Sequence, residues 1–345
     1  MPESIATRRC ALEVIYNGSD ISGNVAQHLE SFSWSGRADG ASDSISIALC
    51  ARGDRPECYD PGAWMNGWFP RADDTVEARL RVTDWREPND NGVMDLGKFT
   101  LDAPGGTLLP TVLSLNGVSQ PASKAFVETK RTQIWQNVSK KKIGGDIAAR
   151  SGLTFFYDGP DIQIKVKEQK NITDAAFYKA LCDDYGFCMK VYADRLVAYD
   201  LKTRKQAAPV ARFVRSDFAA LSFQKIQRGT YTGVRLVHSN AMEEEIVDFQ
   251  LGGGDRMLTL NQKADDRADA ERICRGRINK ENHKATAINW TLALLDTRIV
   301  DGVCFEMVET GTPHLDGKYF VDAVNINKSA GTAMSGTASR VEEMF

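Results

Sequence analysis

The stretch DGKYFVDAVNINKSAG, from Asp316 to Gly331, decides the fold class of this 345-residue chain. It opens with an Asp-Gly turn, continues as a strand whose side chains alternate between two faces, and ends in a polar break and small residues. Alternation with a period of two is typical of a β-strand that buries one face. The chain shows this β framework twice, with a small helical insert between the two parts.

Composition places the chain among ordinary globular proteins. Its length predicts two or three domains, and 42% hydrophobic with 26% charged residues allows a sizeable core. With 43 basic and 46 acidic side chains the formal charge is −3, so no overall basic field favours nucleic acid. The seven cysteines are scattered without CxxC spacing, which argues against a zinc site or a redox dithiol.

Targeting signals are not evident in the sequence. The opening MPESIATRRC lacks the apolar core of a secretory signal. The longest apolar runs, such as the one from Trp290, are about half a dozen residues, whereas a membrane helix needs about 20. We therefore expect synthesis in the cytoplasm, no membrane insertion, and release by a route such as lysis.

Three regions and a tail are predicted along the chain. Residues 1–118 hold several short alternating strands separated by Gly, Asp and Pro, which is typical of a small barrel. Residues 119–205 lose this rhythm and predict a helix–strand–helix–hairpin unit. Residues 206–330 return to β-strands with one long helix and predict a second barrel. Residues 331–345 are small and polar, and we expect this tail to contact a partner.

Helices are predicted at three places. The spacing of Ile134, Val138 and the apolar residues after them predicts a helix that ends at Gly152, a good C-terminal cap. A second helix is expected after Thr173, which is a good N-cap. A third is expected over Lys263–Lys280, packed on the second barrel. Its predicted apolar stripe comprises Ala264, Ala268, Ala270, Cys274 and Ile278.

No motif for catalysis or cofactor binding stands out. The four histidines fit no spaced metal-ligand pattern, and the glycine-rich run Leu251–Arg256 lacks the lysine of a phosphate-binding loop. The acidic runs Glu243–Glu245 and Asp183–Asp184 do not single out two converging carboxylates of the kind a glycosidase needs. We therefore predict no catalytic residue, no metal and no cofactor.

Several segments, in the right order, resemble the phage late control protein D family, the baseplate hub of contractile tails and related particles. They are Glu30–Arg52, Trp68–Leu80, Leu96–Pro104, Arg131–Trp135 with Ile143–Gly159, Lys167–Asp200 and Leu315–Ala338. They are distributed over nearly the whole length of the chain, from Glu30 to Ala338. This chain departs from the family at Asn325, where the family often has histidine after the last valine strand.

The resemblance implies a mainly β protein with an α+β insert, built from two tail-tube-like barrel domains, and a structural role without catalysis. It implies a homotrimer in which three chains with two β units each form a ring of six, matching a sixfold tail tube to a threefold central spike. The implied partners are the spike, the tail tube, the baseplate wedge and the tape measure protein, but no specific nucleic acid. A DNA-carrying phage and a headless bacteriocin or secretion device both fit.

Interface residues are predicted in the loop of residues 51–70 and at the end of the tail. The candidates are Trp64, Trp68, Phe69, Met344 and Phe345. Exposed tryptophans in that loop would also favour a carbohydrate-binding β-sandwich, which remains an alternative.

A tail-associated cell-wall hydrolase is a second alternative. It would require converging carboxylates, or a cysteine–histidine pair such as Cys274 or Cys304 with His283 or His314.

Overall fold

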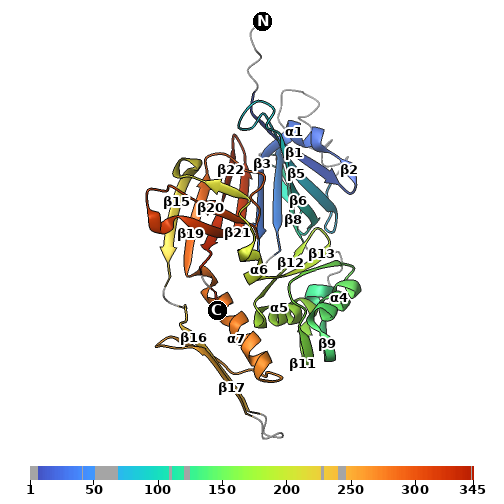
Figure 1. The fold of residues 1–345 in the computed structure, drawn as a ribbon. Helices are drawn as coiled ribbons and strands as arrows, with labels where there is room; N and C mark the ends of the chain where they lie inside the picture. Colours follow the sequence, from blue (N-terminus) through green and yellow to red (C-terminus); the bar gives the residue numbers. More distant parts are fainter. Residues whose placement is uncertain are drawn as a thin grey trace.

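Two β units lie side by side in the computed structural model, above an α/β insert and a helix-backed β-ribbon (Figure 1). The structure describes residues 7–40, 42–50, 69–108, 111–119, 125–226, 229–239, 246–342 and 344–345. The fold class is as predicted, since strands dominate and the longer helices α4 (Lys140–Arg150), α5 (Asp174–Asp184) and α7 (Arg267–Glu281) lie in the lower half of the view in Figure 1.

The first β unit is an antiparallel sheet in the order β3-β4-β8-β6-β5-β1, with short strands at its margins. Its elements are β1 (Arg9–Tyr16), β2 (Ser19–Asp20), α1 (Ser22–His28), β3 (Leu29–Arg37), β4 (Ser44–Cys50), β5 (Thr75–Thr83), β6 (Gly92–Leu101), β7 (Gly105–Leu108) and β8 (Thr111–Val118). The predicted alternation is confirmed: β4 buries Ile45, Ile47 and Leu49 and leaves the residues between them partly exposed.

The second β unit has the order β15-β19-β22-β21, with β20 and β14 added beside one half of β21. Its elements are β14 (Ala211–Phe213), η2 (Arg215–Asp217), β15 (Phe218–Lys225), β19 (Thr286–Leu292), β20 (Cys304–Met307), η4 (Pro313–Leu315), β21 (Gly317–Lys328) and β22 (Thr332–Arg340). The quoted stretch forms β21, as predicted, and Tyr319, Phe320 and Val324 are fully buried in it.

The expectation of a polar tail over residues 331–345 is wrong for most of its length. Thr332–Arg340 forms β22, which pairs with β21 on one side and with β19 on the other. Met334 and Ala338 of this strand are buried. Small residues fit here because the backbone at Gly336 lies against Ala323 and Trp290, which leaves no room for a larger side chain. Small side chains therefore indicate close packing here, where the sequence suggested a surface tail.

The two β units are joined edge to edge. Strand β21 pairs antiparallel with β3 from Ala323↔Arg37 to Lys328↔Phe32, so that one sheet runs through both units. Their apolar cores merge into one, and the indole nitrogen of Trp85 donates to the carbonyl of Leu295 at 2.5 Å across the boundary. The sequence predicted two separate barrels, but the structure shows two halves of a shared sheet and core.

The insert packs two helices against small sheets below the first β unit. Its elements are α3 (Ala125–Glu128), β9 (Lys130–Ser139), α4 (Lys140–Arg150), β10 (Thr154–Asp158), β11 (Gln163–Thr173), α5 (Asp174–Asp184), β12 (Phe187–Tyr192), β13 (Arg195–Asp200) and α6 (Leu201–Gln206). The predicted caps are confirmed: Thr173 accepts from the amide of Ala176, and Gly152 adopts a positive φ of 71° after α4.

The start of the first predicted helix is wrong. Ile134 and Val138 lie in β9, which pairs along its length with β11, and α4 begins only after Ser139 caps the amide of Lys142. Pairing with a distant strand overrode the local helical spacing, and Ile134 is left 58% exposed.

A separate small sheet and the long helix form the last unit. It consists of β16 (Gly233–Ser239), β17 (Ile246–Gly252), β18 (Met257–Leu260), α7 (Arg267–Glu281) and η3 (Asn282–Lys284). The helix packs on this sheet around its own apolar cluster, and not on the second β unit as predicted. Ala264, Ala270, Cys274 and Ile278 are buried as expected, whereas Ala268 is exposed.

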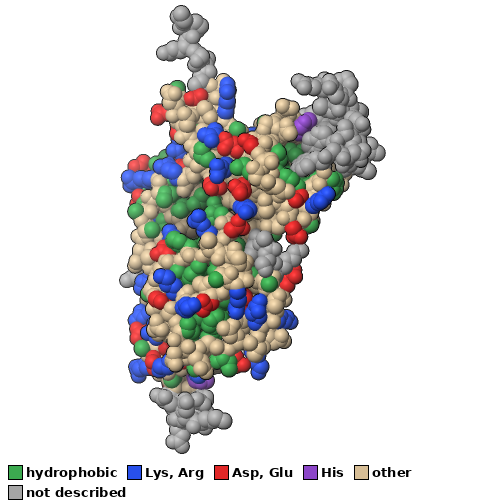
Figure 2. Space-filling model, turned by 90° about the vertical axis from the view of Figure 1, so that its right-hand side faces the viewer, with side chains coloured by type: hydrophobic (Ala, Val, Ile, Leu, Met, Phe, Trp, Pro, Cys, Tyr) green, Lys and Arg blue, Asp and Glu red, His purple; other side chains and the backbone are tan. Residues whose placement is uncertain are grey.

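Charged side chains of both signs are interspersed over the face shown in Figure 2. This agrees with the formal charge of −3, since neither sign dominates the composition. No helix in the described part of the chain has the length and apolar character to cross a membrane.

We predict that Gly336→Ala destabilises the folded chain by about 1–3 kcal/mol, because a side chain added there overpacks the core. A Cβ at this position would overlap the carbonyl oxygen of Ala323 and lie 2.5 Å from the ring of Trp290. Urea unfolding measures the change. Gly331→Ala is the matched control, since a Cβ there meets nothing within 4 Å. Equal stabilities of the two variants would contradict the central placement of β22.

Candidate functional site

The predicted interface residues fall into two groups. Trp64 and Trp68 lie outside the described residues, and Phe69 is half exposed just before β5. Their part in an interface stays a prediction.

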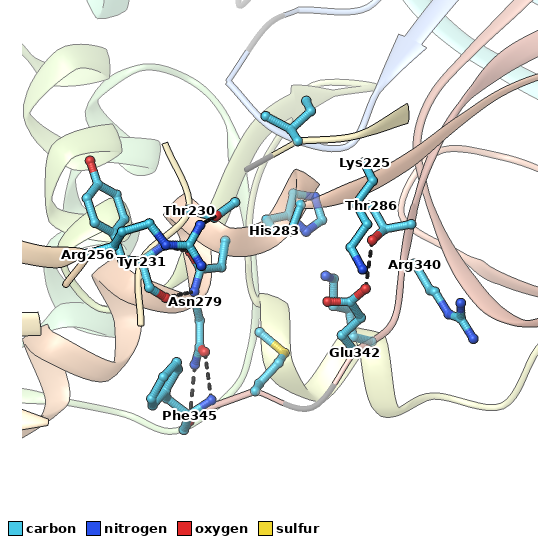
Figure 3. Close-up of a pocket in the computed structure, with 15 residues that line it drawn as sticks. Lys225, Thr230, Tyr231, Arg256, Asn279, His283, Thr286, Arg340, Glu342 and Phe345 are labelled. Carbon is cyan, nitrogen blue, oxygen red and sulfur yellow. Dashed lines mark hydrogen bonds between the residues drawn. The ribbon is translucent and has the colours of Figure 1, made fainter. Parts of the chain in front are cut away.

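Met344 and Phe345 lie against the chain itself. Asn279 of α7 exchanges two hydrogen bonds with the backbone of Phe345, at 2.9 and 3.2 Å (Figure 3). The ring of Phe345 packs at the edge of the cluster under α7, and Met344 packs near Phe320. Both residues therefore help to hold the second β unit, the insert and α7 together, and an interface role for them stays a prediction.

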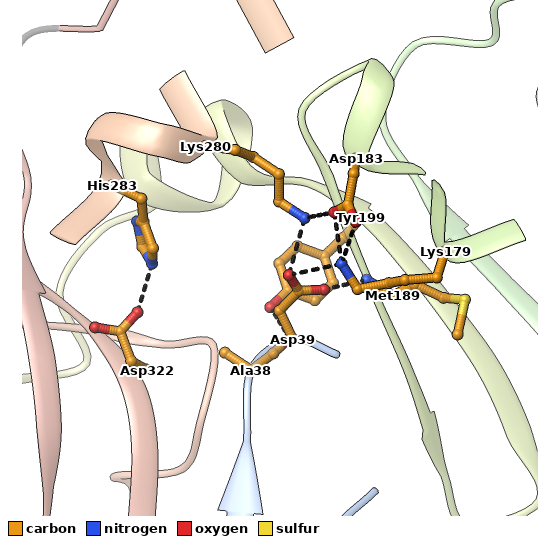
Figure 4. A network of polar contacts seen from close by, with 9 residues as sticks. All are labelled: Ala38, Asp39, Lys179, Asp183, Met189, Tyr199, Lys280, His283 and Asp322. Carbon is orange, nitrogen blue, oxygen red and sulfur yellow. Dashed lines mark hydrogen bonds and ion pairs between the residues drawn. The ribbon is translucent and has the colours of Figure 1, made fainter. Parts of the chain in front are cut away.

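A junction of ion pairs connects the β units with the insert and α7 (Figure 4). Asp39, just beyond β3, receives Lys280 of α7 at 2.8 Å and Lys179 of α5 at 3.3 Å. Both lysines also contact Asp183 of α5. The other carboxylate oxygen of Asp39 accepts from the amide of Met189 in β12 at 2.8 Å. One aspartate thus connects the end of β3 to three elements of the lower half.

Electrostatics keeps this junction ionised. Burial disfavours the charged form of Asp39, but the ammonium groups of Lys280 and Lys179 outweigh burial and hold its pKa below the usual range. Burial also opposes the charge of Lys280, and the surrounding acids raise its pKa above the ordinary value. The pairs are partly accessible, so each contributes less than a fully buried pair would.

A second junction is fully enclosed and joins three units at one ammonium group. Lys190 of β12 lies 2.9 Å from Asp43, which precedes β4, and 2.6 Å from Asp301, which precedes β20. The three side chains are 8%, 0% and 8% exposed in that order. The insert is therefore tied to the first and the second β unit by the same charge.

The backbones of α7 and the insert approach each other closely at two glycines, next to the ion pairs of Lys280. Gly276 of α7 faces Gly186, which follows α5, and a Cβ on Gly276 would lie 2.5 Å from the amide nitrogen of Gly186. Two glycines let α7 and the insert touch backbone to backbone, which brings Lys280 within reach of Asp183.

An open sheet edge lies at the far side of the second β unit, and no motif in the sequence marks it. Among the described strands, β15 pairs only with β19. Most of its side chains are exposed, and Phe223 is 56% exposed beside His314. An aromatic side chain on an unpaired edge favours contact with another chain. Its signal in the sequence is the strand Phe218–Lys225, in which small and polar residues separate Leu221 from the aromatic residues Phe218 and Phe223.

The residues weighed for catalysis have structural partners. His283 contacts Asp322 through Nε2 at 2.5 Å, and Cys304 donates weakly to the carbonyls of Arg204 and Lys205. Cys274 lies under α7, where burial raises its thiol pKa to about 11. Within the described residues neither thiol bonds to a histidine, and no cluster of three His, Cys, Asp or Glu side chains is arranged to hold a metal.

Comparison with known proteins identifies the fold. No family model matches the chain, and no curated protein matches its sequence. A tail protein from Neisseria meningitidis MC58 aligns with a TM-score of 0.72 at 12% identity, over 96% of each chain. The 43 kDa tail protein of prophage MuSo2 from Shewanella oneidensis aligns with a TM-score of 0.68 at 9% identity, over 96% of this chain and 98% of that one.

The chain has the fold of phage tail proteins. This agrees with the baseplate hub family that the sequence resembles. A component of the type VI secretion system from E. coli, described as structurally similar to the T4 tail proteins gp27 and gp5, also aligns, with a TM-score of 0.55 at 8% identity over 92% of this chain and 74% of that one. Within this tail-protein fold, the enclosed junction at Lys190 connects the insert to both β units, and β15 offers an open edge to another chain.

We predict that Lys190→Met destabilises the chain by about 3–5 kcal/mol, because it leaves two carboxylates buried without a counter-charge. Thermal and urea unfolding measure the loss. Lys98→Met is the matched control: Lys98 also pairs with the insert, through Asp194 at 2.8 Å, but both partners are solvent-exposed. Its loss should be within about 1 kcal/mol. Similar losses for the two variants would contradict a special role for the enclosed junction.

We also predict a pH effect centred on Asp43. Burial raises the pKa of Asp43 to about 6, with Lys190 opposing the rise and Asp301 adding to it. Because the pKa of Asp43 is higher in the folded chain than in the unfolded one, protonation of Asp43 favours the folded state. This contribution to the free energy of unfolding is complete below about pH 4 and is lost as the pH rises through the folded pKa.

The variant Asp301→Asn removes one of the two acids, so the pKa of Asp43 should fall and this pH dependence should flatten. Carboxyl-carbon NMR titration of Asp43 in both proteins is the measurement. An Asp43 that titrates at its ordinary pKa in the unsubstituted chain would refute the prediction.

Proposed function

We propose that the chain is the structural baseplate hub of a contractile tail or tail-like particle. In this proposal it is a homotrimer that adapts a sixfold tail tube to a threefold central spike. The baseplate wedge and the tape measure protein are further proposed partners, and the role needs no catalysis by the chain. Assembly in the bacterial cytoplasm and release by lysis belong to the same proposal.

The observation that carries the proposal is the pairing of β21 with β3. It joins the two β units into one sheet, so each chain offers two neighbouring units to the tail tube. Three such chains supply six units, and a threefold object can then face a sixfold one without leaving half of its interfaces unmatched. The tail proteins that share the fold support this assignment.

The open edge of β15 is the proposed contact between subunits. Inside one chain the two units meet through strand edges, and a ring needs the same kind of junction between chains. In the proposed ring, β15 of one subunit lies against the first β unit of the next, and its unpaired amides and carbonyls gain partners there. Phe223 supplies an apolar anchor at this contact.

We predict that light scattering with mass determination finds three chains per particle, for the protein alone or mixed with its spike. Phe223→Lys should raise the dissociation constant of the trimer by about 30-fold, equivalent to about 2 kcal/mol, without loss of folding. Ile134→Lys is the control, since Ile134 is exposed to a similar extent on β9 of the insert.

A monomer under both conditions would contradict the hub. If Ile134→Lys disrupts the trimer and Phe223→Lys does not, the contact lies on the insert and not at β15.

A further inference from the structure

A polar pocket of about 380 Å³ lies where the second β unit, α6, α7 and the β16–β18 sheet meet (Figure 3). Its wall includes Lys205 at the end of α6, Lys225 at the end of β15, and Arg256 in the loop before β18. Neither the tail-protein fold nor the proposed hub role assigns a ligand to it. A volume of this size is within the range of sites that bind small molecules or side chains of a partner.

Lys205 is the unusual member of this wall. It is only 3% exposed. Among the hydrogen bonds and ion pairs of the described residues, its ammonium group has no partner. Burial lowers its pKa, although the charges of Asp322 and, more weakly, of Glu342 in the same wall attract it from beyond contact distance. Buried charges are normally paired, because an unpaired one loses its hydration without compensation.

The other polar groups of the wall mostly satisfy one another. Asn282 exchanges hydrogen bonds with the backbone of Tyr231, and Arg340 donates to the carbonyls of His314 and Asp316. Glu342 is the one acid among the described lining residues, and it accepts from Thr286 at 2.8 Å. The wall therefore carries an excess of positive charge with Lys205 as its enclosed part.

We propose that this pocket binds an oxyanion, either a phosphate or a carboxylate group, with Lys205 as the enclosed counter-charge. The anion pairs with the ammonium of Lys205 and is attracted by Lys225 and Arg256 at the mouth. Such charge-assisted hydrogen bonds are among the stronger polar contacts in proteins. The anion is either free in solution or the side chain of an acidic segment, and these two sources share the same chemistry.

Isothermal titration of the full chain with inorganic phosphate, and separately with a pentaglutamate peptide, tests the proposal. Lys205→Met keeps the length and packing of the side chain and removes its charge. We expect it to weaken binding by about 10-fold to 100-fold, as for loss of a hydrogen bond to a charged group. Lys284→Met is the control, since Lys284 is an exposed neighbouring lysine outside the pocket wall, and it should change binding little.

The outcomes separate the two sources. Phosphate binding that depends on Lys205 identifies a free anion, and peptide binding alone with the same dependence identifies an acidic segment. If neither binds, or if Lys205→Met binds as well as the unsubstituted chain, the proposal is overturned. Thermal unfolding without anions gives an independent readout. Lys205→Met should be at least as stable as the unsubstituted chain, and a clear loss would show that the ammonium already has a counter-charge.

Discussion

One enclosed ammonium group holds the architecture together. Lys190 comes from the insert, Asp43 from the first β unit and Asp301 from the second, so three parts of the chain depend on a single charge. Burial is the main cause of the raised pKa of Asp43, while Lys190 opposes the rise and the second acid, Asp301, adds to it. A buried arrangement of this kind adds little stability over apolar packing, but it penalises any other relative placement of the three parts.

The β3–β21 strand pairing and the ion pairs of Lys190 both connect the first β unit to the second. The seam between β3 and β21 aligns the two units, and Gly36 within it leaves room for the ring of Trp34 and the carboxylate of Asp301. A Cβ on Gly36 would lie 2.5 Å from that ring and 2.6 Å from that carboxylate. The β3–β21 pairing and the ion pairs of Lys190 therefore both depend on Gly36, which has no side chain. The ion pairs of Asp39 with Lys280 and Lys179 then set the position of α7.

Strand periodicity was enough to predict the fold class and the register of burial. Residues such as Ile45, Ile47 and Leu49 alternate because one face of their sheet is dry, and that pattern is local. The cap at Thr173 was likewise predictable from local chemistry. The placement of β9 was not, since Ile134 and Val138 have helical spacing and only their pairing with β11 decides otherwise.

The functional features depend on contacts between distant parts of the sequence. Nothing near Lys190 indicates that Asp43 and Asp301 converge on it, and nothing near Lys205 indicates that it is enclosed. The small residues after Gly331 suggested a tail because side-chain size alone does not distinguish a solvated segment from a tightly packed strand. Comparison of whole folds agrees with the family resemblance of the sequence segments, since the tail-protein architecture is shared at identities of 12% and below.

The pairing of β3 with β21 has a consequence for biosynthesis. The two strands are roughly 290 residues apart, so β3 leaves the ribosome about 15 to 60 seconds before its neighbour at usual translation rates. During that interval one border of the nascent sheet stays open to other polypeptides. Pairing between neighbouring nascent chains on one messenger therefore competes with folding until β21 has been made.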